Sequence, residues 1–318
     1  MNRGQVGSLA GLLDGVSHVL VAARGTSDNA ARYAQYVWGA RNRLAVGLTT
    51  PSLFGPLEAS PDLDGALVVG ISQSGQSPDL VAVLTEARRQ GRPTLAITNS
   101  PASPLAEQAE HVIDIAAGPE EAVAATKTYA GELMAVALCS LAFAGEPLDG
   151  LERLPELVAA SIESSGTVSE AASALAGADR CVVVGRGFHL ATVYEWALKL
   201  QEMAYLLAQP HSAADFLHGP VAVVEPGFPV LAVVTGGPTH GQMEGVAAAM
   251  VDRGATVVTM TDQGHAAGQH LIPIPETEPW LSPIVAAPAL QLFARALTLC
   301  RGLDPESPRG LSKVTRTR

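Results

Sequence analysis

The sequence contains few cysteines and few aromatic residues. Only three cysteines occur, Cys139, Cys181 and Cys300, and they lie far apart with no paired spacing. This argues against a disulfide framework or a zinc site and predicts three buried small side chains. Aromatic residues make up 4% of the chain, whereas hydrophobic residues make up 47%. A chain of 318 residues with this balance predicts about two α/β domains, with Val-rich strands and Ala-rich helices.

The chain also lacks any block of basic residues, and its formal net charge is −11. Nucleic-acid binding needs a basic surface, so we expect no nucleic-acid partner. An anionic ligand would have to be held locally, by helix N-termini and hydroxyl groups, against an unfavourable overall field.

Targeting and membrane signals are absent as well. The stretch from Met1 to Gly15 has no basic segment followed by a continuous apolar core, so we expect no signal peptide. No apolar run reaches membrane-spanning length without interruption. We therefore expect a cytoplasmic protein with no membrane partner.

Apolar strand-like runs alternate with Ala-rich helical stretches, a pattern typical of parallel sheets built from right-handed βαβ units. The expected strands are Val19–Ala23, Ala66–Ile71, Thr94–Thr98, His111–Ile115, Cys181–Val184, Val230–Val234, Thr256–Thr261 and His270–Ile274. The expected helices are Ser27–Trp38, Leu80–Gln90, Ala122–Ala144, Ser161–Leu175, Ala191–Leu207, Gln242–Arg253 and Ser282–Arg301.

The two halves of this pattern match each other. Gly25 after the first strand corresponds to Gly187, 162 residues later, and Thr98 corresponds to Thr261, 163 residues later. A near-constant offset indicates two copies of one α/β domain. We place the first domain at residues 1–150 and the second at residues 151–318, with a hinge near residues 145–154, which are rich in Gly, Pro and charge.

A serine-rich turn follows the strand Ala66–Ile71 and precedes the helix Leu80–Gln90. It contains Ser72, Gln73, Ser74, Gly75 and Ser77. A helix N-terminus carries unpaired N–H groups and a partial positive charge, and glycine lets the backbone approach an anion closely. The turn is a candidate phosphate site, although a serine-rich helix cap without a ligand would look similar.

The second copy has Thr-Gly-Gly-Pro at residues 235–238 in place of this serine cluster. The asymmetry indicates one phosphate site per chain, in the first domain. In open parallel sheets ligands bind at the C-terminal ends of strands, where these turns are expected.

Candidate catalytic groups lie in the second half. Glu195, Lys199 and Glu202 are spaced i, i+4 and i+7 on one helix face. A surface ion-pair row would have the same spacing, but the apolar neighbours of this row favour partial burial and a carboxyl group suited to proton transfer. His218 precedes Gly-Pro and is expected in a tight turn with an extended backbone. Lys313, in a basic C-terminal tail, could bind phosphate or form a Schiff base with a sugar carbonyl.

Together these motifs resemble the sugar-isomerase (SIS) family, specifically the isomerase half of glucosamine-6-phosphate synthases and the stand-alone aminosugar-phosphate deaminases. The resemblance runs from about Val19 to Arg318. The matching motifs are Arg24-Gly25-Thr26-Ser27, Ser72–Ser77, Ala125-Thr126-Lys127, Gly185-Arg186-Gly187, Ala197–Glu202, His218-Gly219-Pro220 and Pro308–Val314.

The resemblance implies two tandem SIS-type α/β/α three-layer domains with parallel, flavodoxin-like sheets. It implies that Glu202 moves a proton between C1 and C2 of a hexose 6-phosphate, that His218 opens the ring from the neighbouring subunit of a homodimer, and that Lys313 closes over the sugar while Lys199 supports Glu202. It assigns substrate and phosphate binding to Thr26, Ser27, Ser72, Gln73, Ser74, Ser77, Val123 and Ala125. It implies no metal and no redox cofactor.

The chain departs from the synthase pattern at several points. About 20 residues precede the first strand and none is cysteine, so we expect no glutaminase domain, and a shortened N-terminal dimer contact. Ala125 stands where the synthase has serine, and Asp215 stands where it has glutamate. The expected reaction is conversion of glucosamine 6-phosphate to fructose 6-phosphate and ammonia. The alternatives are a fructosamine 6-phosphate deglycase, an ammonia-dependent synthase and a sugar-phosphate sensor without catalysis.

Overall fold

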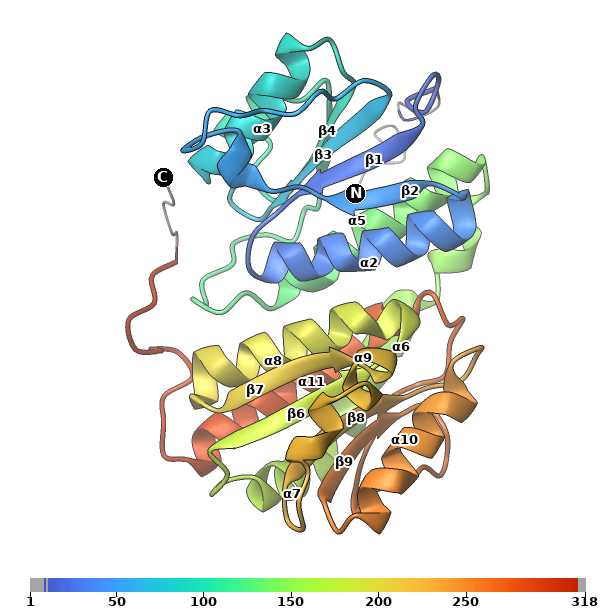
Figure 1. The fold of residues 1–318 in the computed structure, drawn as a ribbon, viewed down its shortest axis with the longest axis vertical. Helices are drawn as coiled ribbons and strands as arrows, with labels where there is room; N and C mark the ends of the chain where they lie inside the picture. The colour runs from blue at the N-terminus through green and yellow to red at the C-terminus, as the bar shows by residue number, and fades with distance from the viewer. Residues whose placement is uncertain (1–8, 10, 314–318) are drawn as a thin grey trace. The chain divides into compact units, whose positions relative to one another are not determined.

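The computed structural model describes residue 9 and residues 11–313. The chain divides into two compact units (Figure 1). Unit 1 comprises the described residues through Gly150 together with Ser312 and Lys313, and unit 2 comprises Leu151–Leu311.

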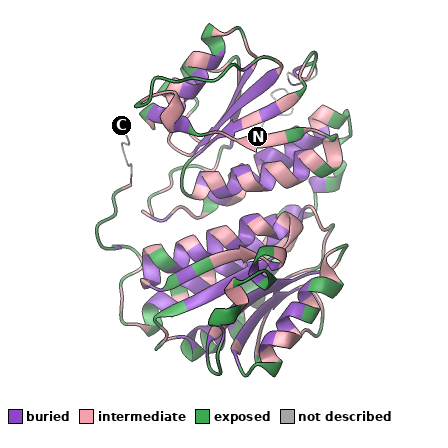
Figure 2. Ribbon diagram, in the orientation of Figure 1, coloured by how far each residue is buried: buried purple, intermediate pink, exposed green. Residues whose placement is uncertain are grey.

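Unit 1 is built on a parallel sheet of five strands in the order β2-β1-β3-β4-β5. Its strands are β1 (His18–Ala22), β2 (Ala45–Leu48), β3 (Ala66–Ser72), β4 (Thr94–Thr98) and β5 (His111–Asp114). Val19 pairs with Val46 of β2 on one side and with Leu67 of β3 on the other. Every residue of β3 is buried, as expected for a central strand covered on both faces (Figure 2).

Helices cover both faces of this sheet. On one face α2 (Thr26–Asn42) packs against α5 (Lys127–Ala144), where the Trp38 indole lies edge-on to Phe143 and donates a hydrogen bond to the Val136 carbonyl. On the other face α3 (Pro78–Arg89) and the short α4 (Pro104–Glu107) bury Leu80, Leu84 and Leu105 against β3 and β4. The result is a three-layer α/β/α unit.

Unit 2 repeats the same topology, with the order β10-β9-β8-β6-β7. Its strands are β6 (Arg180–Gly185), β7 (Leu207–Ser212), β8 (Pro229–Val234), β9 (Thr256–Thr261) and β10 (His270–Pro273). Strands β7, β6, β8, β9 and β10 take the places of β2, β1, β3, β4 and β5. The internal repeat and the predicted fold class are confirmed.

The helices of unit 2 also follow the repeat. Helix α8 (Leu190–Ala204) packs against α11 (Ser282–Cys300), and Trp196 meets Phe293 edge to face, as Trp38 meets Phe143 in unit 1. Helix α10 (His240–Asp252) covers the other face with the short α9 (Ala213–Leu217). By length and composition α11 could cross a membrane, but 67% of its apolar window is buried inside the structure, which is typical of a core helix.

Several sequence predictions were wrong in detail. The edge strands β2 and β7 were not predicted, and Leu207, expected to end a helix, begins β7. Helix α5 begins at Lys127 rather than Ala122. The segment expected as one helix from Ser161 is instead α6 (Leu154–Glu163), a 3-10 turn, η3 (Ser164–Thr167), and α7 (Val168–Ala174).

The cysteine prediction was right for two of the three residues. Cys139 and Cys181 are buried, and burial raises the pKa of each thiol to about 12. Cys300 is exposed on the outer side of the last turn of α11, whereas Thr298 in the same turn is fully buried. Within the described chain, no group of three His, Cys, Asp or Glu residues is placed to hold a metal ion.

Candidate active site

The predicted phosphate turn lies at the topological switch point of unit 1. The chain leaves β1 toward β2 on one side, and leaves β3 toward β4 on the other. Because the following helices, α2 and α3, cover opposite faces, a ligand crevice is expected between the C-terminal ends of β1 and β3. The turn at residues 23–25 and the serine turn at residues 73–77 border this crevice.

Two hydrogen bonds from backbone N–H groups to serine hydroxyls fix the conformation of the serine turn. The Gly75 N–H donates to Ser72 Oγ at 3.1 Å, and the Gln76 N–H donates to Ser74 Oγ at 3.3 Å. Both hydroxyl oxygens therefore act as acceptors toward the chain, which leaves their protons available for an anion. Ser77 is the N-cap of α3 but makes no side-chain cap bond, so its hydroxyl also keeps its donor.

Gln73 and Gly75 anchor this turn to the neighbouring strand connection. The Gln73 carbonyl accepts the Asn99 N–H at 3.1 Å, and the Gly75 carbonyl accepts the Leu105 N–H at 3.1 Å. Gly75 has φ 61°, in the left-handed region that favours glycine. Backbone hydrogen bonds from two residues far along the chain thus fix the turn.

The Arg24 guanidinium, in the turn after β1, forms an ion pair with Asp79 at the start of α3. Its Nε donates to Asp79 Oδ2 at 2.8 Å, and Asp79 Oδ1 accepts the Leu80 N–H at 3.0 Å in the first turn of α3. The bond ties the turn after β1 to the helix after β3. The sequence motif containing Arg24 gave no sign of this pairing with Asp79, which is 55 residues away.

Thr26 and Ser27 open α2 at the other side of the crevice. Ser27 is buried, and its hydroxyl donates to the carboxylate of Glu132 on α5 at 2.8 Å. Glu132 is itself buried. The sequence analysis did not single out Glu132, because a lone acid within an apolar helix carries no recognisable motif.

Val123 and Ala125 lie in the loop between β5 and α5, where an unbroken helix was expected. Both are half-buried. The loop is closed by Glu120, whose carboxylate accepts bonds from Thr126 and Thr128 at the start of α5. The Lys313 ammonium donates to the carbonyl of Ala122 in the same loop. The structure thus brings Lys313, Val123 and Ala125 together within unit 1.

The corresponding turn of unit 2 already holds an anionic group. The Gly236 N–H donates to Asp262 Oδ1 at 2.8 Å, and the Gln263 side chain donates to the same oxygen at 2.7 Å. A carboxylate therefore occupies a backbone donor that would otherwise face a ligand. This supports the inference that only the first copy can accept a phosphate.

The predicted catalytic row lies on α8 in unit 2. The Lys199 ammonium is 2.7 Å from Glu202 Oε2 and 3.4 Å from Glu195 Oε1. The side chains of Glu195 and Lys199 are 0% and 1% exposed, whereas that of Glu202 is 24% exposed. These burials exclude a surface ion-pair row and leave Glu202 as the member that solvent, or a substrate, can reach.

The charges of this row are coupled. Burial opposes a charge on Lys199, but the carboxylates of Glu195 and Glu202 outweigh it and raise the pKa of Lys199 above its usual value. Lys199 is therefore an ammonium at neutral pH, flanked by two acids. Its bond occupies one oxygen of Glu202, which leaves the other available for proton transfer.

His218 lies in a turn at the end of α9, as predicted, and is exposed, but its backbone is not extended. Its φ and ψ are −82° and 10°. The residue that precedes the proline is Gly219, so the restriction imposed by proline falls on Gly219, with φ 159°. In the described part of the chain the His218 imidazole makes no hydrogen bond. The backbone N–H of His218 donates to the Asp215 carbonyl.

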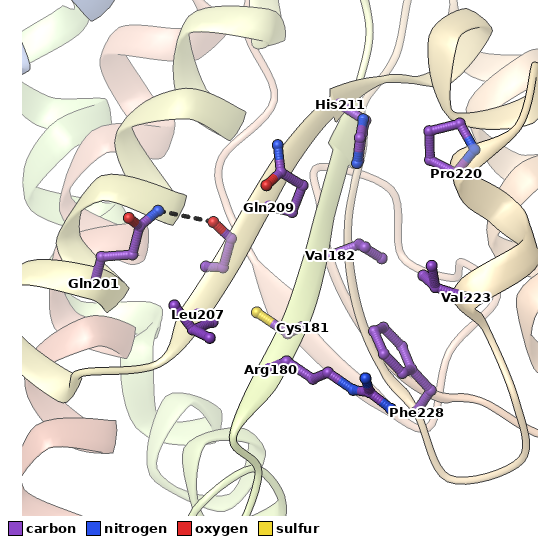
Figure 3. A pocket seen from close by; sticks show the side chains of 11 residues that line it. Arg180, Cys181, Val182, Gln201, Leu207, Gln209, His211, Pro220, Val223 and Phe228 are labelled. Atoms are coloured by element: carbon purple, nitrogen blue, oxygen red, sulfur yellow. Dashed lines mark hydrogen bonds between the residues drawn. The ribbon is translucent and has the colours of Figure 1, made fainter.

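A cavity of about 500 Å³ lies beside β6 and β7 in unit 2, and its wall includes Gln201 and Pro220 from two of the predicted motifs (Figure 3). Cys181, Gln209, His211 and Phe228 line it, and Gln201 donates to the Ala208 carbonyl at its edge. None of Glu202, Lys199 and His218 contributes to its wall. Mainly apolar side chains form this wall, with no serine turn or acid row.

Comparisons with known proteins identify relatives of the whole chain. A profile of the SIS domain matches residues 12–142 and 174–297, one match in each unit. A glutamine–fructose-6-phosphate aminotransferase (isomerizing) of Aeropyrum pernix is 35% identical over 96% of this chain, and that of Methanothermobacter thermautotrophicus is 33% identical over 94%. The chain spans about half the length of these curated relatives, 52% and 51% respectively.

Solved structures match at full length. A Silicibacter pomeroyi protein described as a phosphosugar isomerase is 34% identical, with a TM-score of 0.87, and the match covers 95% of this chain and 93% of that one. Glucosamine-6-phosphate deaminase of Thermotoga maritima is 20% identical, with a TM-score of 0.81 and 99% coverage of both chains. The second likeness concerns the fold alone.

Proposed function

This chain belongs to the SIS domain family, and from that premise we propose that it is a phosphosugar isomerase acting on an aminohexose 6-phosphate. The preferred reaction converts glucosamine 6-phosphate and water to fructose 6-phosphate and ammonia. The observation that carries the proposal is the buried ammonium of Lys199 held between Glu195 and Glu202, with only Glu202 accessible.

The geometry suits proton transfer between adjacent carbons. In the open-chain aminosugar, Glu202 would take the proton from C2, giving an enaminol between C1 and C2. The same carboxyl group would return the proton to C1, which produces a ketimine at C2 that water hydrolyses to the ketose and ammonia. Lys199 would stabilise the carboxylate and the negative charge that develops on the sugar oxygen.

The serine turn would hold the 6-phosphate. Three hydroxyl donors, on Ser72, Ser74 and Ser77, lie between the end of β3 and the start of α3, a 12-residue helix whose N-terminal dipole favours an anion. Gln73 is half-buried in the same turn. Thr26, Ser27, Val123 and Ala125 would then contact the sugar.

We further propose a homodimer in which His218 opens the sugar ring in the neighbour's site. His218 is exposed on unit 2, and it lies in a segment with the exposed apolar side chains Leu217 and Val223. Burial of these side chains against a second copy of the chain would stabilise such a dimer. Ring opening needs a proton donor and acceptor near neutral pH, which histidine supplies.

The test is ammonia release from a panel of aminohexose 6-phosphates by the parent, Glu202→Gln and the control Glu225→Gln. Glu225 is an exposed acid of the same unit. Glutamine keeps the shape of Glu202 but cannot accept a proton, so kcat should fall by roughly two to four orders of magnitude, with KM nearly unchanged. Solvent-deuterium exchange at C1 or C2 should fall in parallel.

Near-parental turnover and exchange in Glu202→Gln would show that another group is the base. Amine release from fructosamine 6-phosphate without activity on glucosamine 6-phosphate would replace the preferred reaction with the deglycase. Binding of the panel without turnover by the parent would favour a sensor.

A further inference from the structure

We propose that Glu120 is a positioning residue that fixes the sugar-side loop of unit 1 and sets the place and charge of Lys313. This rests on the proposed function, in which Lys313 closes over the sugar. Glu120 itself touches no reacting atom in this scheme. It acts through the loop at residues 121–125 and through the tail lysine.

The Glu120 carboxylate joins the two ends of that loop with four hydrogen bonds. Its Oε2 accepts the backbone N–H groups of Thr126 and Thr128, at 3.1 and 3.0 Å, and the Thr128 hydroxyl at 2.9 Å. Its Oε1 accepts the Thr126 hydroxyl at 3.2 Å. Thr128 is fully buried, so one end of this closure is anchored in the core.

The closed loop presents the carbonyl that receives Lys313. Between Glu120 and Thr126 lie Val123, Ala125 and Ala122, and the Ala122 carbonyl accepts the Lys313 ammonium. The negative charge of Glu120 and the positive charge of Lys313 also attract each other. Burial opposes ionisation of Glu120, but the hydrogen bonds from Thr128 and Thr126 and the charge of Lys313 together lower the pKa of Glu120. One acid thus connects the start of α5, the loop and the tail.

A plain helix cap would explain part of this arrangement. Thr126, the N-cap residue of α5, makes no side-chain cap bond, and Glu120 satisfies the orphan N–H groups instead. A cap, however, requires only an acceptor, which an amide also provides. The attraction to Lys313 requires the negative charge, so the two roles can be separated by one substitution.

Glu120→Gln separates them, and Glu121→Gln is its matched control. An amide oxygen in the place of Oε2 can keep three of the four bonds, and the Thr126 hydroxyl can rotate to accept from the amide N–H group, while the charge is lost. Glu121 is the next residue and is exposed. The other charged side chain at this helix start, Lys127, is also exposed and serves as an internal reference.

The measurement is the rate of amine labelling at Lys313, followed by mass spectrometry from pH 7 to pH 10 in the full chain without substrate. Loss of the nearby carboxylate should shift the labelling profile to lower pH and raise the rate at pH 8 by roughly threefold to tenfold. Glu121→Gln should stay within about twofold of the parent. With glucosamine 6-phosphate, Glu120→Gln should lose about tenfold in kcat/KM, mainly through kcat.

An unchanged Lys313 profile in Glu120→Gln would overturn the proposal. So would an equal change in Glu121→Gln, or a rate that rises by the same factor at every pH, which would report exposure of the tail rather than a changed charge. The labelling needs no substrate, so it decides the role of Glu120 even where the proposed deaminase activity fails. Circular dichroism and thermal unfolding check that both variants fold.

Discussion

The Arg309 guanidinium lies over the ring of Tyr205, 3.8 Å from its centroid, and the Arg309 backbone N–H donates to the Tyr205 hydroxyl at 2.7 Å. Tyr205 is the left-handed C-cap of α8, three residues after Glu202. The tail is therefore attached to the end of the helix that carries the proposed base. Lys313 follows Arg309 by four residues along the chain.

We expect Tyr205→Ala to release the tail, and Tyr205→Phe to release it only in part. Phenylalanine keeps the stacking and loses the hydroxyl, whereas alanine loses both contacts. Each contact contributes about 1 kcal/mol, so local opening should increase roughly 5- to 30-fold in Tyr205→Ala. The measurement is the rate of tryptic cleavage after Arg309, with cleavage after the exposed Arg89 as internal reference. Equal cleavage rates in all three proteins would contradict the attachment.

Gly75→Ala should disable the phosphate turn. A Cβ at Gly75 would lie 2.0 Å from Ser103 Oγ and 2.5 Å from Ser103 Cβ, so the turn or the start of α4 must move. Gly91→Ala is the matched control, because Gly91 shares the positive φ, at 67°, but a Cβ there meets open space. We expect KM for the phosphorylated substrate to rise at least tenfold in Gly75→Ala and in Ser72→Ala with Ser74→Ala, but not in Gly91→Ala.

The phosphate assignment also makes inorganic phosphate a competitive inhibitor of the parent. Its inhibition constant should rise in the same variants by a similar factor, since the two ligands share the serine turn. A KM that is unchanged in the double serine variant would remove the turn from the site.

Local periodicity was enough to predict the central strands of both sheets. Strands β3, β4, β8 and β9 are rich in apolar and β-branched residues, and the structure places each within two residues of its predicted bounds. The edge strands are different. Strand β2 is four residues long, and β7 contains Pro210 and exposed side chains, so neither has the composition of a buried strand. Sheet pairing, rather than local sequence, defines them.

The predicted site residues divide in the same way. The i, i+4, i+7 spacing predicted the contacts of Lys199, because helix geometry alone places these side chains together. No spacing predicts that Glu132 meets Ser27 or that Asp79 meets Arg24, since these pairs depend on how helices pack over a sheet. The helix predicted from Ala122 failed because Glu120 caps α5 from outside the helix, starting it at Lys127.

Acid should destabilise this protein through His189. This side chain is fully buried, bonded to Thr192 and Ser282 at 3.0 Å each, and burial lowers its pKa to about 3. The unfolded chain binds a proton near pH 6.5 and the folded chain does not, so stability falls as pH drops from about 6.5 toward 3. Between pH 7 and pH 5 this group alone should remove about 2 kcal/mol of unfolding free energy.

His189→Gln should weaken that dependence, because glutamine keeps hydrogen-bonding capacity without a titrating group. The measurement is the urea midpoint at pH 7 and pH 5, with the exposed His265→Gln as control. The parent and His265→Gln should lose stability equally between the two pH values, and His189→Gln should lose less. The same loss in all three proteins would assign the acid sensitivity to other groups.

Mixing two inactive variants can decide which subunit supplies His218 to each active site. In a homodimer with shared sites, His218→Ala supplies an intact Glu202 and Glu202→Gln supplies an intact His218. A heterodimer of the two then has one complete site, whereas sites built within one chain would all remain incomplete. Random pairing makes half of the dimers mixed, so co-expression with separate affinity tags should restore about a quarter of the parental activity. Purification through both tags should double that fraction. Activity that stays at the level of the separate variants would contradict shared sites, and so would a parent that sediments as an active monomer. Either result would mean that His218 and Glu202 act within one chain, or that His218 takes no part in the reaction.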